Sequence, residues 1–215
     1  MVRLMQVLFG DTRKKSYLEI MQKLNIGRMC IRDKPNPYKN ENWGFDNGSY
    51  SYFLNGIKFN ENEYLRRFEK AYKIKNDPYI AVLPDIVAGG ELSLDFSLKW
   101  LEQLPKNWNW YLAIQDGMSF ISVENALKDK EIKGIFLGGT DNFKGRYGLI
   151  YRQLADKMNK KYHFGRAGTL RRIRYVKELN CDSFDSAFPL WTEKRFNTII
   201  ILIKNNFEYT QQEIF

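Results

Sequence analysis

The sequence has few of the residues that bind metals or form disulfides. Its 215 residues include two cysteines, Cys30 and Cys181, and one histidine, His163. The cysteines lie far apart and form neither a CxxC pair nor a disulfide framework, which fits a reducing compartment and argues against a Cys-rich zinc site. A single histidine also argues against a multi-histidine metal site and a Ser-His triad. We therefore expect no metal and no other cofactor.

Long apolar runs are missing as well. No stretch approaches the roughly 18 consecutive apolar residues of a membrane span, and the N-terminal MVRLMQVLFGDTRKK lacks the apolar region and cleavage site of a signal peptide. These absences predict a cytoplasmic protein with no membrane partner. What is present, 44% hydrophobic and 15% aromatic residues, suffices for the core of one domain spanning residues 1–215.

The charge is strongly positive. The chain carries 34 Lys and Arg against 25 Asp and Glu, a formal net charge of +9. Such a balance favours a polyanionic partner, since Lys and Arg bind phosphates and release counterions. Many basic proteins bind no nucleic acid, however, so the net charge supports this function only together with a binding site.

Short strand-like runs alternate with helical stretches along the chain, which indicates an α/β fold. The predicted strands are Arg3 to Phe9, Arg28 to Arg32, Trp43 to Asp46, Tyr79 to Asp85, Trp110 to Asp116, Lys133 to Gly139, Tyr162 to Arg166 and Asp182 to Asp185. Eight strands with helical crossovers in 215 residues predict a compact (β/α)8 TIM barrel. The alternative is an open doubly wound sheet.

The helices predicted between these strands are Lys14 to Leu24, Glu61 to Lys73, Leu92 to Leu104, Val123 to Lys128, Leu149 to Lys160 and Thr169 to Leu179. A closing helix is predicted over Thr192 to Phe207. Its β-branched run TIIILI, however, could equally form a strand.

Polar or glycine residues stand at the ends of six predicted strands, where a TIM barrel carries its catalytic groups. They are Asp46, Asp85, Gln115 with Asp116, Gly138 with Gly139, Gly165 with Arg166, and Asp185. A single aspartate at such a place is more often a helix cap or an Asx-turn. Because the six ends meet on one face of a barrel, together they predict one shared site.

Five short motifs at these strand ends resemble those of the tRNA-guanine transglycosylases and the related DNA 7-deazaguanine transglycosylases. FDSAFP resembles the nucleophile segment of the family, FDNGSY its Asp-Ser-Gly-Gly-Phe turn, AIQDG its Gln-Gly strand end and FLGGT its Gly-Gly loop. LPDIVAGG takes the place of its base-binding aspartate. The motifs follow in the family's order from about Trp43 to Pro189, which is most of the chain.

The resemblance implies a role for each residue of the site. Asp185 would attack C1′ of a guanosine nucleotide and form a covalent glycosyl–enzyme, and Asp46 would be the general acid and base for the two bases. Asp85, Gln115 and backbone groups at Gly138 and Gly139 would hold the edge of guanine or a 7-deazaguanine. Retaining glycoside hydrolases likewise use two carboxyl groups on either side of a glycosidic bond. Here the incoming base would replace water as the acceptor of the glycosyl group.

Asp182 and Asp185 are three residues apart on one predicted strand, so their side chains face opposite sides. One of them alone can point into the barrel mouth. The resemblance selects Asp185. We expect Asp182 to cap a neighbouring element or to pair with an arginine.

Positive charge is most concentrated in HFGRAGTLRRIRYVKEL. Arg166 at the strand end and Arg171, Arg172 and Arg174 on the following helix could bind phosphates, for which guanidinium forks are suited. The alternative is an amphipathic surface helix with solvated arginines. His163, in the same segment, is expected to be a packed structural residue of its strand.

The chain departs from the tRNA enzymes, because no cysteine or histidine follows Cys181 to build their zinc-binding subdomain. HFGRAGTLRRIRYVKELNCDSFDS looks more like the DNA-modifying branch of bacteria and phages. We therefore expect DNA as substrate, with tRNA as the alternative, and a 7-deazaguanine base such as 7-cyano-7-deazaguanine, inside a bacterial cell or a phage-infected host.

A base in a stacked duplex must be flipped out before it can react. The candidate stacking partners are Phe45, Tyr50, Tyr52 and Phe143. A helper protein could open the DNA. Two other classes of function stay open: a nucleoside or glycoside hydrolase using the same carboxylates with water, and a non-catalytic nucleic-acid-binding barrel. It also stays open whether the loop Arg32 to Asn42 touches nucleic acid or links two strands.

Overall fold

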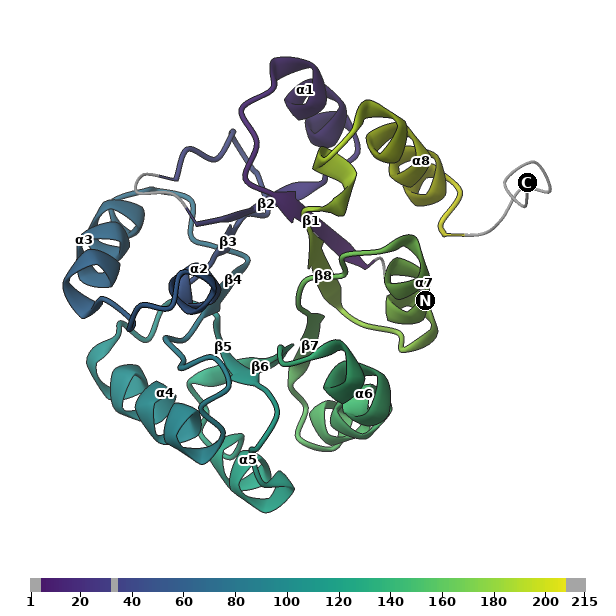
Figure 1. Cartoon of the computed structure of the whole chain (residues 1–215). Helices are drawn as coiled ribbons and strands as arrows, with labels where there is room; N and C mark the ends of the chain where they lie inside the picture. The colour runs from purple at the N-terminus through teal and green to yellow at the C-terminus, as the bar shows by residue number, and fades with distance from the viewer. Residues whose placement is uncertain (1–4, 32–34, 208–215) are drawn as a thin grey trace.

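Eight parallel strands close into a barrel in the computed structural model of the chain, each paired with the next and β8 with β1 (Figure 1). The structure describes residues 5–31 and 35–207. The strands are β1 (Gln6–Gly10), β2 (Gly27–Cys30), β3 (Gly44–Phe45), β4 (Ile80–Val82), β5 (Trp110–Ile114), β6 (Ile132–Leu137), β7 (Lys161–Phe164) and β8 (Ser183–Ser186).

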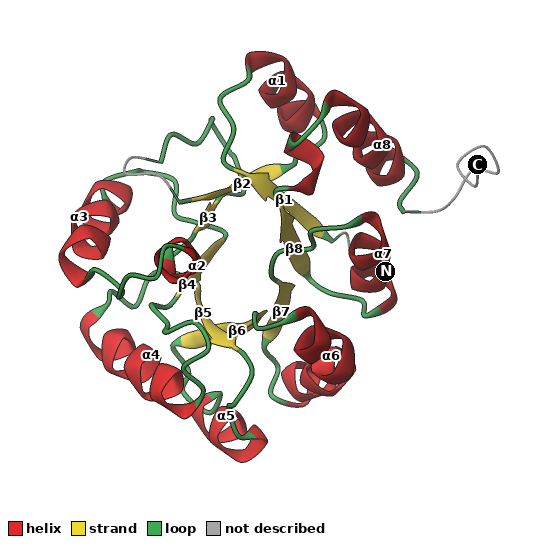
Figure 2. Ribbon diagram, viewed as in Figure 1, coloured by secondary structure: helices red, strands yellow, loops and turns green. Residues whose placement is uncertain are grey.

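Helices surround the barrel, mostly in an outer ring, while the short helix Ser49–Leu54 lies closer to the strands (Figure 2). They are α1 (Lys15–Lys23), α2 (Ser49–Leu54), α3 (Glu61–Tyr72), α4 (Glu91–Gln103), α5 (Phe120–Ala126), α6 (Asp141–Lys157), α7 (Leu170–Glu178) and α8 (Glu193–Lys204), with a 3-10 turn at Phe188–Leu190. The fold is a (β/α)8 TIM barrel, which confirms the prediction of a barrel. The alternative prediction of an open doubly wound sheet is wrong. Each predicted strand is present, although the predicted start at Arg3 and the predicted end at Arg32 lie outside the described residues.

Three helical predictions need correction. Helix α6 begins at Asp141, eight residues before the predicted start, because the Thr140 side chain caps it by accepting a bond from the Phe143 N–H. Helix α5 begins at Phe120, and α2 was not predicted at all. The run TIIILI lies in α8 rather than in a strand, since the helix packs Phe196, Ile199 and neighbouring apolar residues against the core.

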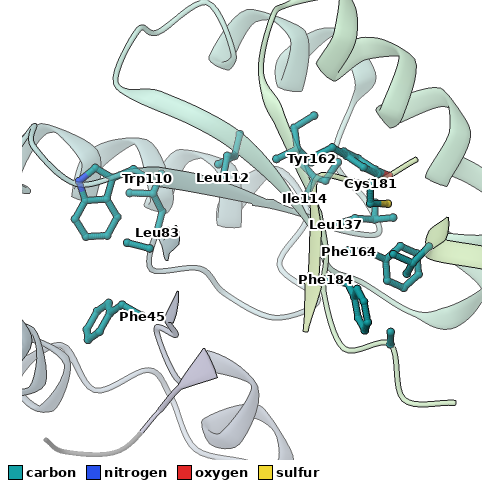
Figure 3. Close-up of a cluster of buried hydrophobic side chains, with 14 of the residues drawn as sticks. Phe45, Leu83, Trp110, Leu112, Ile114, Leu137, Tyr162, Phe164, Cys181 and Phe184 are labelled. Carbon is teal, nitrogen blue, oxygen red and sulfur yellow. The ribbon is translucent and has the colours of Figure 1, made fainter. Parts of the chain in front are cut away.

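The strands alternate between two hydrophobic layers. Outward-facing residues such as Phe45, Trp110, Leu112, Phe164 and Phe184 pack between barrel and helices (Figure 3). A smaller set fills the interior: Leu8, Met29, Ile80, Val82, Tyr111, Ala113 and Phe136. Residues paired across parallel strands share a face, so the pairings place His163 beside Phe136, and Asp185 beside Leu8, on the inner face. The inside of the barrel therefore carries polar groups on β7 and β8.

Candidate functional site

Asp182, just before β8, and Asp185, within it, face opposite sides as the alternation of a strand predicts. Asp182 faces outward, where it accepts a hydrogen bond of 3.0 Å from Arg152 of α6 and one of 2.9 Å from the Tyr162 N–H. Asp185 faces inward and is 8% exposed. The expected pairing of Asp182 with an arginine is confirmed, and Asp185 is the one that reaches the barrel mouth.

The carboxylate of Asp185 is held at one oxygen. Its Oδ1 lies 3.0 Å from His163 Nε2 and accepts a 3.0 Å hydrogen bond from the backbone N–H of Arg166. Both of the hydrogen bonds that the described residues make to this carboxylate go to Oδ1. The other oxygen, Oδ2, therefore has lone pairs left to accept further hydrogen bonds.

Asp46 belongs to a tight turn after β3. Its Oδ1 accepts a 2.7 Å bond from the Gly48 N–H, an Asx-turn, and Gly48 takes a positive φ of 82°. Arg67 of α3 donates to the carbonyls of Asp46 and Asn47 and so fixes the turn. Burial raises the pKa of Asp46, the Gly48 N–H opposes this, and the nearby charge of Asp185 raises the pKa further. Asp185 is thus close enough to Asp46 for its charge to act on that carboxyl group.

Asp85, three residues after the end of β4, is a buried carboxyl of the candidate base site. It accepts hydrogen bonds from the Asn47 amide at 2.8 Å and from Gln115 Nε2 at 3.3 Å. Burial raises the pKa of Asp85 from 3.8 to about 6, against the bonds from Asn47 and Ser49. A carboxyl of this kind changes its charge close to neutral pH.

The side-chain amide of Gln115 is already engaged by the protein. Its Oε1 accepts a 2.6 Å bond from the Ala88 N–H, and its Nε2 donates to the Ile86 carbonyl at 2.9 Å and to Ser93 Oγ at 2.8 Å. Gln115 thereby fixes the loop between β4 and α4. In this arrangement it positions Asp85 rather than presenting a free amide.

The two glycines after β6 differ from each other. The Gly138 N–H donates to the Ile114 carbonyl at 2.9 Å and continues the sheet. Gly139 has a φ of 76°, and a Cβ there would lie 2.6 Å from an Asp116 oxygen. Asp116 in turn accepts bonds from both the N–H and the hydroxyl of Thr140. Asp116 is thus a loop-fixing residue, and Gly139 is required because a side chain there would collide with it.

The predicted base-binding groups and Asp46 converge, whereas Asp185 is not among the lining residues of their cavity. Asp46, Asp85, Gln115, Gly138, Gly139 and Arg166 all line one cavity of about 50 Å³ at the carboxyl end of the barrel. This volume is far below the several hundred Å³ of typical ligand sites. Tyr50 of α2 lines the same cavity, and the Arg166 guanidinium lies 3.7 Å from its ring centroid. A planar ligand could reach the face of the Tyr50 ring only if Arg166 moved away from it.

A wider groove of about 540 Å³ adjoins this cavity. It shares Tyr50 and Arg166 with the cavity and adds Lys144 and Arg172. Arg172 forms an ion pair with Asp141. Arg171, which is exposed, and Arg174, which is half-buried, are not among the lining residues. The predicted arginine cluster is therefore divided, with Arg166 and Arg172 at the site and the other two away from it.

Sequence reasoning missed Lys144. This lysine on α6 is 3% exposed and its ammonium donates a 2.6 Å bond to the Gly165 carbonyl. Burial, together with the charge of Arg166, lowers the pKa of Lys144 from 10.5 to about 8. The signal in the sequence was a lone cation four residues after the Thr140 cap, which becomes informative once α6 is known to begin at Asp141.

Of the four aromatic candidates, Tyr50 alone lies at the cavity. Phe45 is fully buried on the helix-facing side of the barrel, and Phe143 packs against Tyr147 and Tyr151. The Tyr52 hydroxyl donates to Glu63, and its ring lines a separate apolar groove. The prediction is therefore wrong for Phe45 and Phe143, because the pleat and the start of α6 turn their side chains into the core.

Part of the loop Arg32 to Asn42 is anchored to β2. Glu41 is buried and receives two 2.8 Å bonds from the guanidinium of Arg28, and the Tyr38 hydroxyl donates to the Ile26 carbonyl. Arg32 and the two residues after it lie outside the described residues. The described part of the loop links and braces the barrel wall.

Among residues 5–31 and 35–207, no group of three or more His, Cys, Asp or Glu side chains could hold a metal ion. The helices in these ranges are also too short or too polar to span a membrane. A scan against models of known protein families found no match to this chain, and a search of curated protein sequences found none either.

Proposed function

We propose that this protein is a base-exchange transglycosylase that replaces guanine in DNA by a 7-deazaguanine base. The observation that carries the proposal is a pair of neighbouring carboxyl groups on different elements. Asp185 of β8 is held by His163 of β7, Asp46 is held in the turn after β3, and the charge of Asp185 acts on Asp46. A nucleophile and a proton carrier on either side of a glycosidic bond are what retaining exchange requires.

The reaction has two halves. Asp185 Oδ2 attacks C1′ of the target nucleotide, the C1′–N9 bond breaks, and guanine leaves with the bonding electron pair and the proton of Asp46. The incoming base then gives its N9 proton to Asp46, its N9 attacks C1′, and the bond to Asp185 breaks. A raised pKa suits Asp46 to this role, because it keeps a proton available for the departing base.

Asp85 is the group suited to recognise the base edge. Its buried carboxyl lies in the same cavity as Asp46 and can accept hydrogen bonds from the N1–H and the exocyclic amine of guanine. Gln115 and Asn47 keep the carboxyl in place. Tyr50 stacks on the base once Arg166 has moved away from its ring.

The groove beside the cavity supports a nucleic acid as the acceptor, and DNA is proposed over tRNA because no cysteine or histidine follows Cys181 to build the zinc-binding subdomain of the tRNA enzymes. Arg166 and Arg172 supply guanidinium groups next to the aromatic side chains of Tyr50 and Phe53. Phosphates and unstacked bases match that combination. A cavity inside the barrel mouth admits a nucleotide only when it is flipped out or single-stranded.

The test is base exchange with labelled 7-cyano-7-deazaguanine and four acceptors: duplex DNA, DNA with an unpaired bubble, single-stranded DNA and tRNA. The bubble replaces any helper protein that opens the duplex. Asp185→Asn removes the nucleophile and is expected to abolish incorporation and the covalent adduct on the Asp185 peptide. Asp95→Asn, at an exposed aspartate of α4, is the matched control and should react normally.

Each acceptor gives a distinct answer. Label in DNA that depends on Asp185 supports the proposal, and label in tRNA alone moves the protein to the tRNA alternative. Free guanine and abasic DNA without incorporation would identify a hydrolase. No chemistry with any acceptor, including the bubble, would refute the proposal.

A further inference from the structure

The one histidine of the chain is buried directly beneath the nucleophile of the proposed reaction. His163 on β7 is 0% exposed and points into the barrel with Asp185 and Ser183 of β8. Its Nε2 lies 3.0 Å from Asp185 Oδ1 and its Nδ1 lies 2.8 Å from Ser183 Oγ. Both ring nitrogens therefore have a partner on the neighbouring strand, in a chain Ser183–His163–Asp185.

Two aromatic neighbours fix the plane of the ring. Phe136 of β6 stacks on it, with ring centroids 4.9 Å apart and an angle of 19° between the planes. Tyr111 of β5 approaches edge-on at 6.5 Å and 85°. The imidazole cannot turn away from Asp185 without disturbing the packed interior of the barrel.

The hydrogen bonds select one form of the imidazole. Ser183 is also 0% exposed, and His163 Nδ1 is the hydrogen-bond partner that the described residues give to its hydroxyl. If Nδ1 carried a hydrogen, it would donate to Ser183 Oγ and leave the hydroxyl hydrogen buried without an acceptor, which is unfavourable. Ser183 therefore donates to a bare Nδ1, and the single ring hydrogen lies on Nε2, aimed at Asp185.

We propose that His163 is a positioning residue for Asp185, a neutral imidazole locked by Ser183 that donates its Nε2–H to Oδ1 and leaves Oδ2 to act as the nucleophile. This inference rests on the proposed function for its catalytic meaning, although the hydrogen-bond chain does not depend on it. With the Arg166 N–H, the histidine gives Oδ1 two donors. The same donors stabilise the carboxylate when the glycosyl bond to Oδ2 breaks again.

The hydrogen-bond chain can be observed directly by NMR. Protein labelled with ¹⁵N-histidine and prepared without a histidine tag has one imidazole, that of His163. At pH 7.5 we expect a protonated Nε2 and a bare, hydrogen-bonded Nδ1. Ser183→Ala should shift the Nδ1 signal mainly, and Asp185→Asn the Nε2 signal mainly. A hydrogen on Nδ1, on both nitrogens, or an Nε2 signal that ignores Asp185→Asn would overturn the proposal.

Two amide substitutions test the positioning role in exchange. Glutamine places its Nε2 close to the position of the histidine Nε2, whereas asparagine is too short to reach Asp185. We expect His163→Gln to keep kcat within about tenfold and His163→Asn to lower kcat by a further ten- to hundredfold, roughly the effect of one hydrogen bond to a charged group, with KM little changed. Equal kcat values for two folded variants of similar melting temperature would refute the role.

The two proposals fail separately. The expected NMR pattern without exchange on any acceptor would keep the hydrogen-bond chain and refute both the transglycosylase function and the positioning role in it. Base exchange by a protein whose His163 carries its hydrogen on Nδ1 would support the transglycosylase function and refute the positioning role of His163. Exchange, the expected pattern and a difference between glutamine and asparagine together support both.

Discussion

Replacement of Asp85 by asparagine should stabilise the protein at neutral pH while weakening its binding of a base. Asp85 is 9% exposed, and burial raises its pKa from 3.8 to about 6. A rise of this size corresponds to about 3 kcal/mol, because each pH unit is worth about 1.4 kcal/mol. The oxygen of an asparagine at position 85 can still accept the hydrogen bond from Asn47, but its NH2 group would face the NH2 group of Gln115. This unfavourable contact reduces the gain, so about 3 kcal/mol is an upper limit.

The pH dependence gives the sign of this effect. Below pH 3.8 Asp85 is protonated in the folded and the unfolded chain, and the charge makes no difference. Between pH 3.8 and about 6 the folded state binds more protons than the unfolded state, so the stability supplied by Asp85 falls as the pH rises. Above pH 6 the folded protein holds a carboxylate in a site that disfavours it, and the full penalty applies.

Thermal unfolding of the wild type and Asp85→Asn at several pH values measures the effect. For a chain of this length, about 3 kcal/mol is a rise in Tm of roughly 6–12 °C at pH 8, and the difference should vanish near pH 4. Calorimetric titration with 7-cyano-7-deazaguanine should show weaker binding to the variant. A Tm difference that is the same at both pH values, or a less stable variant at pH 8, would refute the reasoning.

Three other substitutions test separate parts of the structure. Glu41→Ala leaves the buried guanidinium of Arg28 without its bidentate partner and should lower the unfolding free energy by about 3–5 kcal/mol in a urea titration; a loss below about 1 kcal/mol would contradict this. Arg172→Gln should weaken binding of single-stranded DNA and reduce the slope of log K against log[salt] by about 1. Arg171→Gln, outside the groove, should have a smaller effect, and equal effects of the two substitutions would exclude the groove as the phosphate site. Tyr50→Ala should weaken binding of the free base by about 1–3 kcal/mol in calorimetry, and unchanged affinity would exclude stacking on this ring.

The stacked Tyr50 and Arg166 bear on how the site opens. They come from α2 and from the loop after β7, and both line the cavity and the groove beside it. The guanidinium carbon of Arg166 lies 3.7 Å from the centroid of the tyrosine ring, over the face on which a base would stack. Under the proposed function, entry of a base would replace Arg166 as the partner of the Tyr50 ring and free Arg166 towards the groove.

Local patterns in the sequence were enough for the fold. A strand in a TIM barrel is a short apolar run followed by a polar strand end, and the helices between strands repeat an apolar stripe, so the eight strands could be read from neighbouring residues alone. The opposite orientation of Asp182 and Asp185 followed from the two-residue repeat of a strand. The convergence of Asp46, Asp85 and Gln115 on one cavity followed from the parallel order of the strands.

Contacts between residues far apart in the chain decided the rest. His163 and Asp185, which form a hydrogen bond, are 22 residues apart in the sequence, and Gln115 accepts a hydrogen bond from the Ala88 N–H, 27 residues away. Neither contact can be recognised from a pattern in the sequence, because the hydrogen bonds depend on which strands are neighbours and on the register between them. Burial of the carboxyl of Asp85, and hence its raised pKa, likewise depends on several loops that close around it. The residue types and their order thus determined the barrel and the face that carries the site, whereas the state of each functional group was decided by tertiary packing, which alone sets its neighbours and its access to water.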